Sequence, residues 1–460
     1  MDDAAPTGEI TVAFRAPTAR SGLLTWAQRE MWHQFSRTRP HHYYFNSTRL
    51  FRVPEKCRIG DVTEAVRRLV ECYEAFRTTI GVTSGGVPRQ HVAGEGVYRL
   101  ALHEAGEDEG GLAERLSYEY RGRGFDDDEW PLRVAVITRA GEPALVLFTV
   151  SHLAADRVGL DVASEAFVRL LAGERDALPA TVMQPLDQVA VEDSPVGERA
   201  AARAVAYWER TVATIPHTMF PDRSPAVPGN WSPVGVLRSP AAGLAAAVLG
   251  AELGVSPGGA VLAAAAALLS TRTGNTTVAL GLFAANRSVP GARDMVSTCV
   301  QPALFSVDVP AASFRELIRS TWTSSLLAYR HAWYPPDLIG DVVERASRRR
   351  GQPIELDCQV QDYSGYSRAR PIAPSPQEVH TALPRSRFSR SALWTRDQLL
   401  LLTIAGHPGS ELRFSVASDP AVLPVPELER FVRGIELLLV RAVVADFELG
   451  EVPELTGLFR

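Results

Sequence analysis

The sequence predicts a mixed α/β or α+β protein made of two similar-sized lobes. Helical and strand-like patterns alternate in each half of the 460-residue chain, and the later strands occur in hairpins as well as in crossovers. A polar, proline-bearing stretch from about residue 173 to residue 199 separates the halves. The hydrophobic content of 46% and the charged content of 22% are those of an ordinary globular protein.

The composition argues against several classes of function. A net charge of -5 gives no global electrostatic reason to bind nucleic acid or an anionic membrane. The four cysteines lie far apart, which indicates neither a disulfide framework nor a clustered zinc site. No signal peptide follows Met1, and the apolar run at residues 260–269 is too short to cross a bilayer. We therefore expect a cytoplasmic protein without a nucleic-acid or membrane partner.

The N-terminal lobe is expected to span residues 21–180, after a loose polar arm at residues 1–20. Its first firm element is a helix from Thr25, because Thr25 and Gln28 form a capping-box pattern. Apolar periodicity predicts the elements that follow. These are a strand at 43–53, helices from about residue 61 and at 112–121, and a hairpin of strands at 134–138 and 144–150.

The C-terminal lobe is expected to span residues 181–460. Ser256 and Pro257 mark a helix N-terminus, because serine caps well and proline tolerates the first turn. The surrounding GxSxG pattern is not a hydrolase nucleophile, since Pro257 lacks the N–H that the oxyanion hole needs. The other expected elements are helices through 207–208, at 241–253, from 313 and at 426–444, and strands at 277–284, 356–363, 399–405 and 411–417.

One stretch carries the candidate chemistry. Residues 144–150 form a continuous apolar run that suits a buried strand. The polar residues that follow it within seven positions are Ser151, His152, Asp156 and Arg157. A loop at the end of a rigid strand can hold such side chains at a cleft. From position alone, the pattern is equally compatible with a surface histidine beside an N-capping Asp161.

Five segments, taken in order, carry a resemblance to a known family. They are Leu24–Trp32, Tyr73–Thr78, Phe125–Arg133, Ser151–Arg157 and Asn286–Arg287. They resemble the opening helix, the HE-x-LRT and FD-PL-R segments, the active-site HHxxxDG and the NR pair of one family. Through their order and spacing, the chain resembles the condensation domains of nonribosomal peptide synthetases, within the chloramphenicol-acetyltransferase-like superfamily. The match covers nearly the whole chain.

The resemblance implies two acetyltransferase-like lobes arranged in a V around a central tunnel. Carrier proteins would present a thioester and an amine there on phosphopantetheine arms, or the amine would be a small molecule. A free-standing enzyme would join them as an amide or an ester, with no bound cofactor and no metal. By the same resemblance, His152 is the catalytic residue, and Asp156 is a structural residue that pairs with Arg287 from the other lobe.

Two departures from the family motif keep other functions open. Ser151 replaces the first motif histidine, and Arg157 replaces the motif glycine where the tunnel is usually open. One alternative is a catalytically degenerate platform that binds a carrier protein or a tailoring enzyme. Another is an acyltransferase that uses coenzyme A or releases its product by cyclisation.

Overall fold

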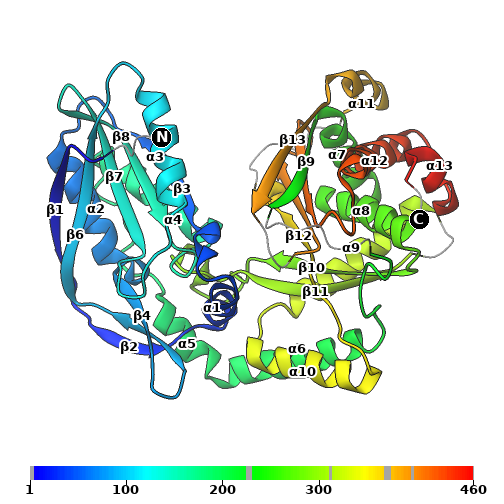
Figure 1. Ribbon diagram of the computed structural model, residues 1–460, viewed down its shortest axis with the longest axis horizontal. Helices are drawn as coiled ribbons and strands as arrows, with labels where there is room; N and C mark the ends of the chain where they lie inside the picture. The colour runs from blue at the N-terminus through cyan, green and yellow to red at the C-terminus, as the bar shows by residue number, and fades with distance from the viewer. Residues whose placement is uncertain (1–4, 224–230, 310–312, 367–373, 395–397, 459–460) are drawn as a thin grey trace. The chain divides into compact units, whose positions relative to one another are not determined.

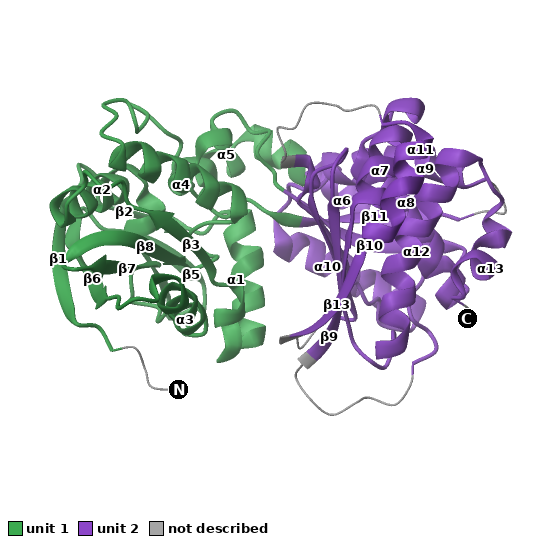
Figure 2. Ribbon diagram, turned by 90° about the horizontal axis from the view of Figure 1, so that it is seen from above, with its two compact units in different colours: residues 1–201, 285–301 green, residues 202–284, 302–460 purple. Residues whose placement is uncertain are grey.

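The fold is described from a computed structural model of the chain. The structure describes residues 5–223, 231–309, 313–366, 374–394 and 398–458. The chain divides into two compact units, which are coloured separately in Figure 2. Unit 1 comprises residues 1–201 and 285–301, and unit 2 comprises residues 202–284 and 302–460. Each unit combines strands and helices, so the predicted mixed α/β class is confirmed.

The strands of unit 1 form two sheets (Figure 1). The strands are β1 (Gly8–Arg15), β2 (Arg20–Leu23), β3 (Ser47–Arg52), β4 (Thr78–Val82), β5 (Pro88–Val92), β6 (Glu95–Glu104), β7 (Leu132–Arg139) and β8 (Glu142–Val150). The larger sheet has the order β1-β6-β7-β8-β3, and the smaller one has the order β2-β5-β4. Strands β7 and β8 form the predicted hairpin.

Helices cover both faces of the larger sheet in unit 1. The helices and 3-10 turns of this unit are α1 (Trp26–Thr38), η1 (His41–Phe45), α2 (Ile59–Cys72), η2 (Glu74–Arg77), α3 (Glu109–Arg121), α4 (Arg157–Leu171), α5 (Pro185–Glu192) and η3 (Ala292–Asp294). Successive side chains of β7 point to opposite faces. Val134 and Val136 pack with α2 and α4, whereas Ala135 and Ile137 pack with α3. Both faces of the sheet are therefore buried.

The N-terminal segment departs from the sequence prediction. The expected loose arm at residues 1–20 is wrong, because β1 pairs antiparallel with β6 over eight residue pairs. Val12 and Phe14 alternate with exposed residues and are buried under α2, which stabilises this edge strand. The strand expected at 43–53 also begins later, since residues 41–45 form η1.

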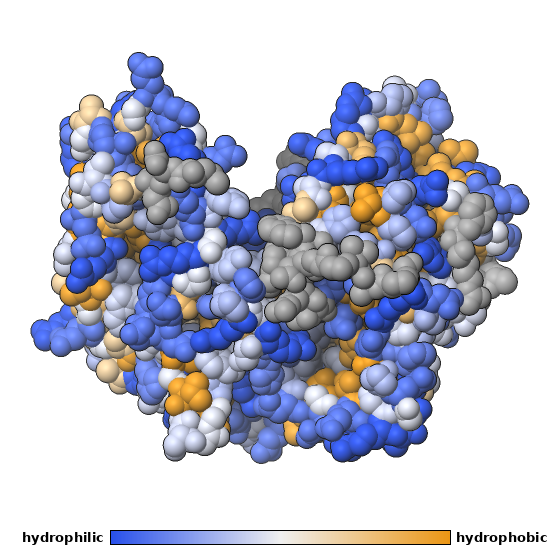
Figure 3. All heavy atoms as spheres, in the orientation of Figure 1, coloured by the Kyte–Doolittle hydropathy of each residue, from blue (hydrophilic) through white to orange (hydrophobic). Residues whose placement is uncertain are grey.

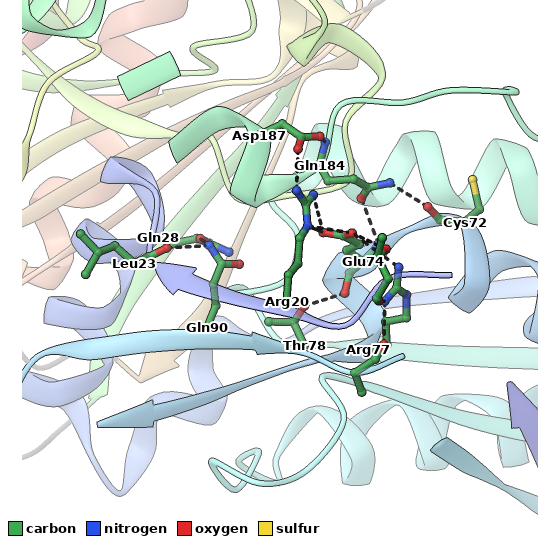
Figure 4. Close-up of polar contacts among 12 residues, drawn as sticks. Arg20, Leu23, Gln28, Cys72, Glu74, Arg77, Thr78, Gln90, Gln184 and Asp187 are labelled. Atoms are coloured by element: carbon green, nitrogen blue, oxygen red, sulfur yellow. Dashed lines mark hydrogen bonds and ion pairs between the residues drawn. The ribbon is translucent and has the colours of Figure 1, made fainter. Parts of the chain in front are cut away.

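A buried polar network connects β2, η2 and α5 in unit 1 (Figure 4). Arg20 donates to the buried carboxylate of Glu74 at 2.8 Å and to Asp187 at 2.7 Å. Arg77 donates to the carbonyl oxygens of Thr18 and Ala93 at 2.9 and 2.6 Å. The HE-x-LRT-like segment therefore has a structural role, because its charged side chains, Glu74 and Arg77, form hydrogen bonds and ion pairs with neighbouring segments.

The boundary expected between residues 180 and 181 also differs from the structure. Unit 1 continues to residue 201 and regains residues 285–301 after the chain has entered unit 2. Helix α5 holds the first of these extensions, because Asp187 bonds Arg20 and Glu192 accepts from the backbone N–H of Trp26 at 2.9 Å. The second extension is held by the site described below.

Unit 2 is built on a seven-stranded sheet with the order β11-β10-β12-β14-β15-β9-β13. The strands are β9 (Trp231–Ser239), β10 (Thr277–Ala284), β11 (Gln301–Asp308), β12 (Cys358–Asp362), β13 (Arg387–Trp394), β14 (Leu400–Gly406) and β15 (Leu412–Ser418). Strands β10, β12 and β14 run parallel, and β14 and β15 form the predicted hairpin.

Four helices of unit 2, α7 (Pro240–Leu253), α8 (Pro257–Thr273), α9 (Phe314–Arg330) and α12 (Val425–Val444), gather on one face of its sheet (Figure 2). The helices and 3-10 turns are α6 (Pro195–Val212), which begins in unit 1, and α7 (Pro240–Leu253), α8 (Pro257–Thr273), α9 (Phe314–Arg330), α10 (Pro336–Arg350), η4 (Ser364–Tyr366), α11 (Pro376–Ala382), η5 (Leu383–Arg385), α12 (Val425–Val444), η6 (Leu449–Glu451) and α13 (Val452–Thr456). As predicted, Ser256 is the N-cap of α8, and residues 260–269 are buried in the core.

The surface is mostly polar on the face that Figure 3 shows, with hydrophobic side chains scattered among hydrophilic ones. Such scattered apolar exposure is normal for globular proteins. Among the described helices, none is by itself long and apolar enough to cross a membrane. Helices α7 and α8 pass that test only as a pair, and the pair is bent by 106°.

Candidate active site

The candidate site begins where β8 ends. Strand β8 lies between β7 and β3, and Val150 pairs with Leu132 on one side and Ser47 on the other. The last six residues of β8 are buried. A central strand fixed on both sides leaves little freedom to the residue that follows it. The loop with the SHxxxDR motif therefore starts from a rigid point.

His152 lies on this loop, and its imidazole is partly exposed. Its Nδ1 atom is 3.2 Å from the hydroxyl oxygen of Thr298, and that hydroxyl donates to the backbone carbonyl of His152. The ring of Phe45 meets the imidazole edge-on at 6.5 Å between centroids. Among the residues that the structure describes, none hydrogen-bonds to Nε2. Burial lowers the pKa of the imidazole, although the negative charge of Asp156 opposes the shift.

Asp156 holds three groups in place. Its carboxylate accepts from the backbone N–H of Gly159 at 2.8 Å, from Arg287 at 2.7 Å and from the N–H of Cys299 at 2.9 Å. The side chains of Arg287 and Asp156 are only 8% and 5% exposed. The ion pair expected from the sequence is thus present. Its placement between two lobes is wrong, because residues 285–301 return to unit 1.

The residues next to Asp156 have different surroundings. Asp156, rather than Asp161, is the N-cap of α4. Asp161 instead forms an ion pair with Arg49 at 2.7 Å and lies 3.6 Å from Arg157. The Arg157 side chain is 45% exposed. Replacing the motif glycine with arginine therefore adds a charged and accessible side chain in the first turn of α4.

Ser151 has a structural role in the turn that follows β8. Its backbone N–H donates to the carbonyl of Pro131 at 2.9 Å, and its side-chain oxygen accepts from the N–H of Leu153 at 3.4 Å. The serine lines a small cavity of about 40 Å³ together with Gln28, Phe35 and others. Such a volume holds a few water molecules at most. The serine shapes the turn after β8 and gives the site no second basic group.

The side chains near this loop do not suit a cysteine nucleophile or a metal site. Burial raises the pKa of the Cys299 thiol, and the charge of Asp156 adds to the effect, so the thiol stays protonated. Within the described part of the chain, no three His, Cys, Asp or Glu side chains gather as metal ligands. His152 is therefore the basic group that the site offers.

Three residues of the site were missed by reasoning from the sequence. Thr298 and Phe45 contact His152, and Gly159 packs under the segment that carries Thr298. Thr298 lies 146 positions after His152, and no motif links them. Gly159 did leave a signal, because a glycine in a helical pattern often marks a close approach of backbones.

Replacing Gly159 with alanine is expected to destabilise the protein by about 1–3 kcal/mol, through overpacking. The added Cβ would lie 2.8 Å from the carbonyl oxygen of Ser297 and 3.2 Å from Arg287 Nη2. Urea unfolding measures the change. Gly60, in the first turn of α2, has open space around it, so Gly60→Ala is the matched control and should not destabilise. Equal unfolding midpoints for the two variants would contradict the close packing at Gly159.

The family model described as "Condensation domain" matches residues 19–369. A hybrid PKS-NRPS synthetase from Talaromyces variabilis is 25% identical over 360 residues, which are 74% of this chain and 9% of that protein. The phosphinothricin tripeptide synthetase PhsC from Streptomyces viridochromogenes is 25% identical over 332 residues, or 68% of this chain and 30% of that protein. The chain thus spans less than a third of either relative.

Solved structures show the same fold. The condensation domain from the monacolin K polyketide synthase MokA has a TM-score of 0.74 at 15% identity, over 94% of this chain and 99% of that one. The first condensation domain of the calcium-dependent antibiotic synthetase, in complex with a substrate analogue, has a TM-score of 0.66 at 18% identity, over 94% and 98%. At these identities, the likeness concerns the fold alone.

Proposed function

Because the chain belongs to the condensation domain family, we propose that it joins an acyl or peptidyl thioester on a carrier protein to an amine, forming an amide. The observation that carries the proposal is the surroundings of His152. One nitrogen of its imidazole contacts Thr298, and among the described residues none bonds the other. Burial lowers its pKa, so the ring is a neutral base near pH 7.

To form an amide from a thioester and an amine, the enzyme needs to provide a base and to hold the two reactants in a fixed geometry. The amine nitrogen attacks the thioester carbonyl carbon, the carbon–sulfur bond breaks, and the phosphopantetheine thiol leaves. His152 accepts the proton that the amine loses and can return it to the leaving sulfur. General-base assistance contributes roughly 10²- to 10⁴-fold, and orientation of the two reactants supplies further acceleration. The chain itself needs no bound cofactor in this reaction, because the phosphopantetheine arm belongs to the carrier protein.

The relatives support a donor that a carrier protein presents. Their names describe a tripeptide synthetase and a hybrid synthetase of polyketide and peptide type. A non-catalytic platform is the second candidate, and the identities of Ser151 and Arg157 favour it. It would keep the carrier-binding surface while the charged Arg157 side chain hinders an incoming arm.

An intact-mass assay tests the proposal. The chain is incubated with carrier proteins bearing a short acyl, a long acyl or an aminoacyl group, together with free or carrier-bound amines. We expect the loaded carrier to lose the mass of its acyl group while an amide of matching mass accumulates. A reaction without the enzyme controls for spontaneous aminolysis, and the His152→Ala variant reports the contribution of the histidine.

Three other outcomes would replace the proposal. If the chain binds the carrier but the acyl group is lost no faster than without enzyme, the platform is favoured. Acyl transfer from coenzyme A thioesters, with no transfer from any carrier, would favour a coenzyme A-dependent acyltransferase. A cyclic product formed without an added amine would indicate release by cyclisation.

The pH dependence of the reaction should report His152. Because burial lowers its pKa, we expect the acid limb of kcat/KM to lie below the ordinary histidine value of about 6.5. Ionisation of the acceptor amine gives a separate limb at higher pH. Two acceptors of different amine pKa separate the limbs, since only the amine limb should move. A limb above pH 7 that stays in place with both acceptors would contradict a neutral base with a lowered pKa.

A further inference from the structure

The Thr298 hydroxyl makes two contacts with the same histidine. It donates to the backbone carbonyl oxygen of His152, and its oxygen lies 3.2 Å from Nδ1 of the imidazole. The threonine is buried and belongs to unit 1, as His152 does. The contact pair therefore lies within one compact unit.

Counting protons assigns the tautomer of the ring. A hydroxyl has one proton to donate, whereas a carbonyl oxygen can only accept. The carbonyl of His152 takes the Thr298 proton, so toward the ring the hydroxyl oxygen can only accept. In the neutral imidazole one nitrogen carries hydrogen and the other carries the lone pair. Nδ1 must then be the protonated nitrogen, and Nε2 keeps the lone pair.

The backbone on both sides of Thr298 is held by the buried ion pair. Asp156 accepts from the N–H of Cys299 at 2.9 Å, and its own N–H donates to the carbonyl of Ser297 at 3.3 Å. Arg287 donates to the same Ser297 carbonyl at 3.1 Å. Three bonds thus fix the residues that flank Thr298, which limits where its hydroxyl can lie.

We propose that Thr298 is a positioning residue that holds His152 as the Nδ1–H tautomer, with Nε2 as the base that faces the amine. The Asp156–Arg287 pair then acts on the reaction through Thr298. The kinetic part of this inference rests on the proposed function. The tautomer itself does not, because it is a property of the protein without substrate.

The test compares Thr298→Val with Thr298→Ser. Valine keeps the shape and removes the hydroxyl, whereas serine keeps the hydroxyl. The first readout is the ¹⁵N spectrum of protein labelled at histidine, at about pH 8, where an ordinary histidine is neutral. The ten histidines are resolved by subtracting the spectrum of His152→Gln. The imidazole also has a hydrogen bond with the backbone of His152 itself, which Thr298→Val keeps. We expect an Nδ1–H signature for His152 in the wild type and in Thr298→Ser, and a smaller Nδ1–H fraction in Thr298→Val.

The second readout is turnover with a loaded carrier. Loss of one hydrogen bond should lower kcat by about 3- to 10-fold in Thr298→Val, with KM little changed and with recovery in Thr298→Ser. An Nε2–H signature in the wild type, or an unchanged tautomer ratio in Thr298→Val, would overturn the inference. If no carrier substrate is turned over, the proposed function fails. The ¹⁵N spectrum still shows whether Thr298 sets the tautomer of His152.

Discussion

Replacing His152 with alanine is expected to lower amide formation by roughly 10²- to 10⁴-fold, because the proposed reaction loses its general base. The fold should survive this change. The imidazole is partly exposed, and the Thr298 hydroxyl keeps its bond to the backbone carbonyl of residue 152. No buried polar group is left without a partner by the substitution, so little stability should be lost.

Single-turnover formation of the amide, with urea unfolding measured in parallel, checks this expectation. The control is His380→Ala, because His380 is exposed on α11 and belongs to unit 2, whereas His152 belongs to unit 1. That variant should keep the wild-type rate. A His152→Ala protein that also keeps it would show that orientation of the reactants alone produces the acceleration, and the proposed role of the histidine would be withdrawn.

Replacing Asp156 with alanine is expected to destabilise the protein by about 3–5 kcal/mol, because Arg287 then stays buried without its counter-ion. The carboxylate also caps α4 and accepts from Cys299, so the same change removes two more bonds. The distance of 2.7 Å and the exposures of 8% and 5% place this pair among buried ion pairs. Urea unfolding gives the magnitude.

An exposed pair of equal length provides the control. Asp161 and Arg49 are also 2.7 Å apart, but their side chains are 47% and 31% exposed. Asp161→Ala should therefore cost about 0–1 kcal/mol. The double variant Asp156→Ala with Arg287→Met should be more stable than the sum of the single changes predicts, because no charge is left buried. Strict additivity, or a cost for Asp156→Ala no larger than that of Asp161→Ala, would contradict the buried pair.

Local patterns predicted much of the fold. The capping box of α1, the hairpin of β7 and β8, the buried alanine-rich α8 and the hairpin of β14 and β15 all follow from residues close together in the sequence. The strands that were missed are β1, β2, β4, β5, β6, β9, β11 and β13. Five of them, β1, β2, β4, β11 and β13, are edge strands, and an edge strand leaves a weaker apolar pattern because one of its sides has no partner strand.

The residues of the candidate site likewise fall into those predicted from the sequence and those found only in the tertiary structure. By itself, the sequence determined that a histidine and an aspartate follow a buried strand, and the resemblance to condensation domains implied that an arginine far along the chain is the counter-ion of that aspartate. Only the tertiary structure decided that residues 285–301 return to unit 1, that the backbone of Ser297 packs closely against Gly159, and that Thr298 contacts the imidazole of His152. The physical reason is that helix and strand periodicity arises between neighbours in sequence. A hydrogen bond between residues 146 positions apart depends on how the chain returns, and no periodic pattern records that return.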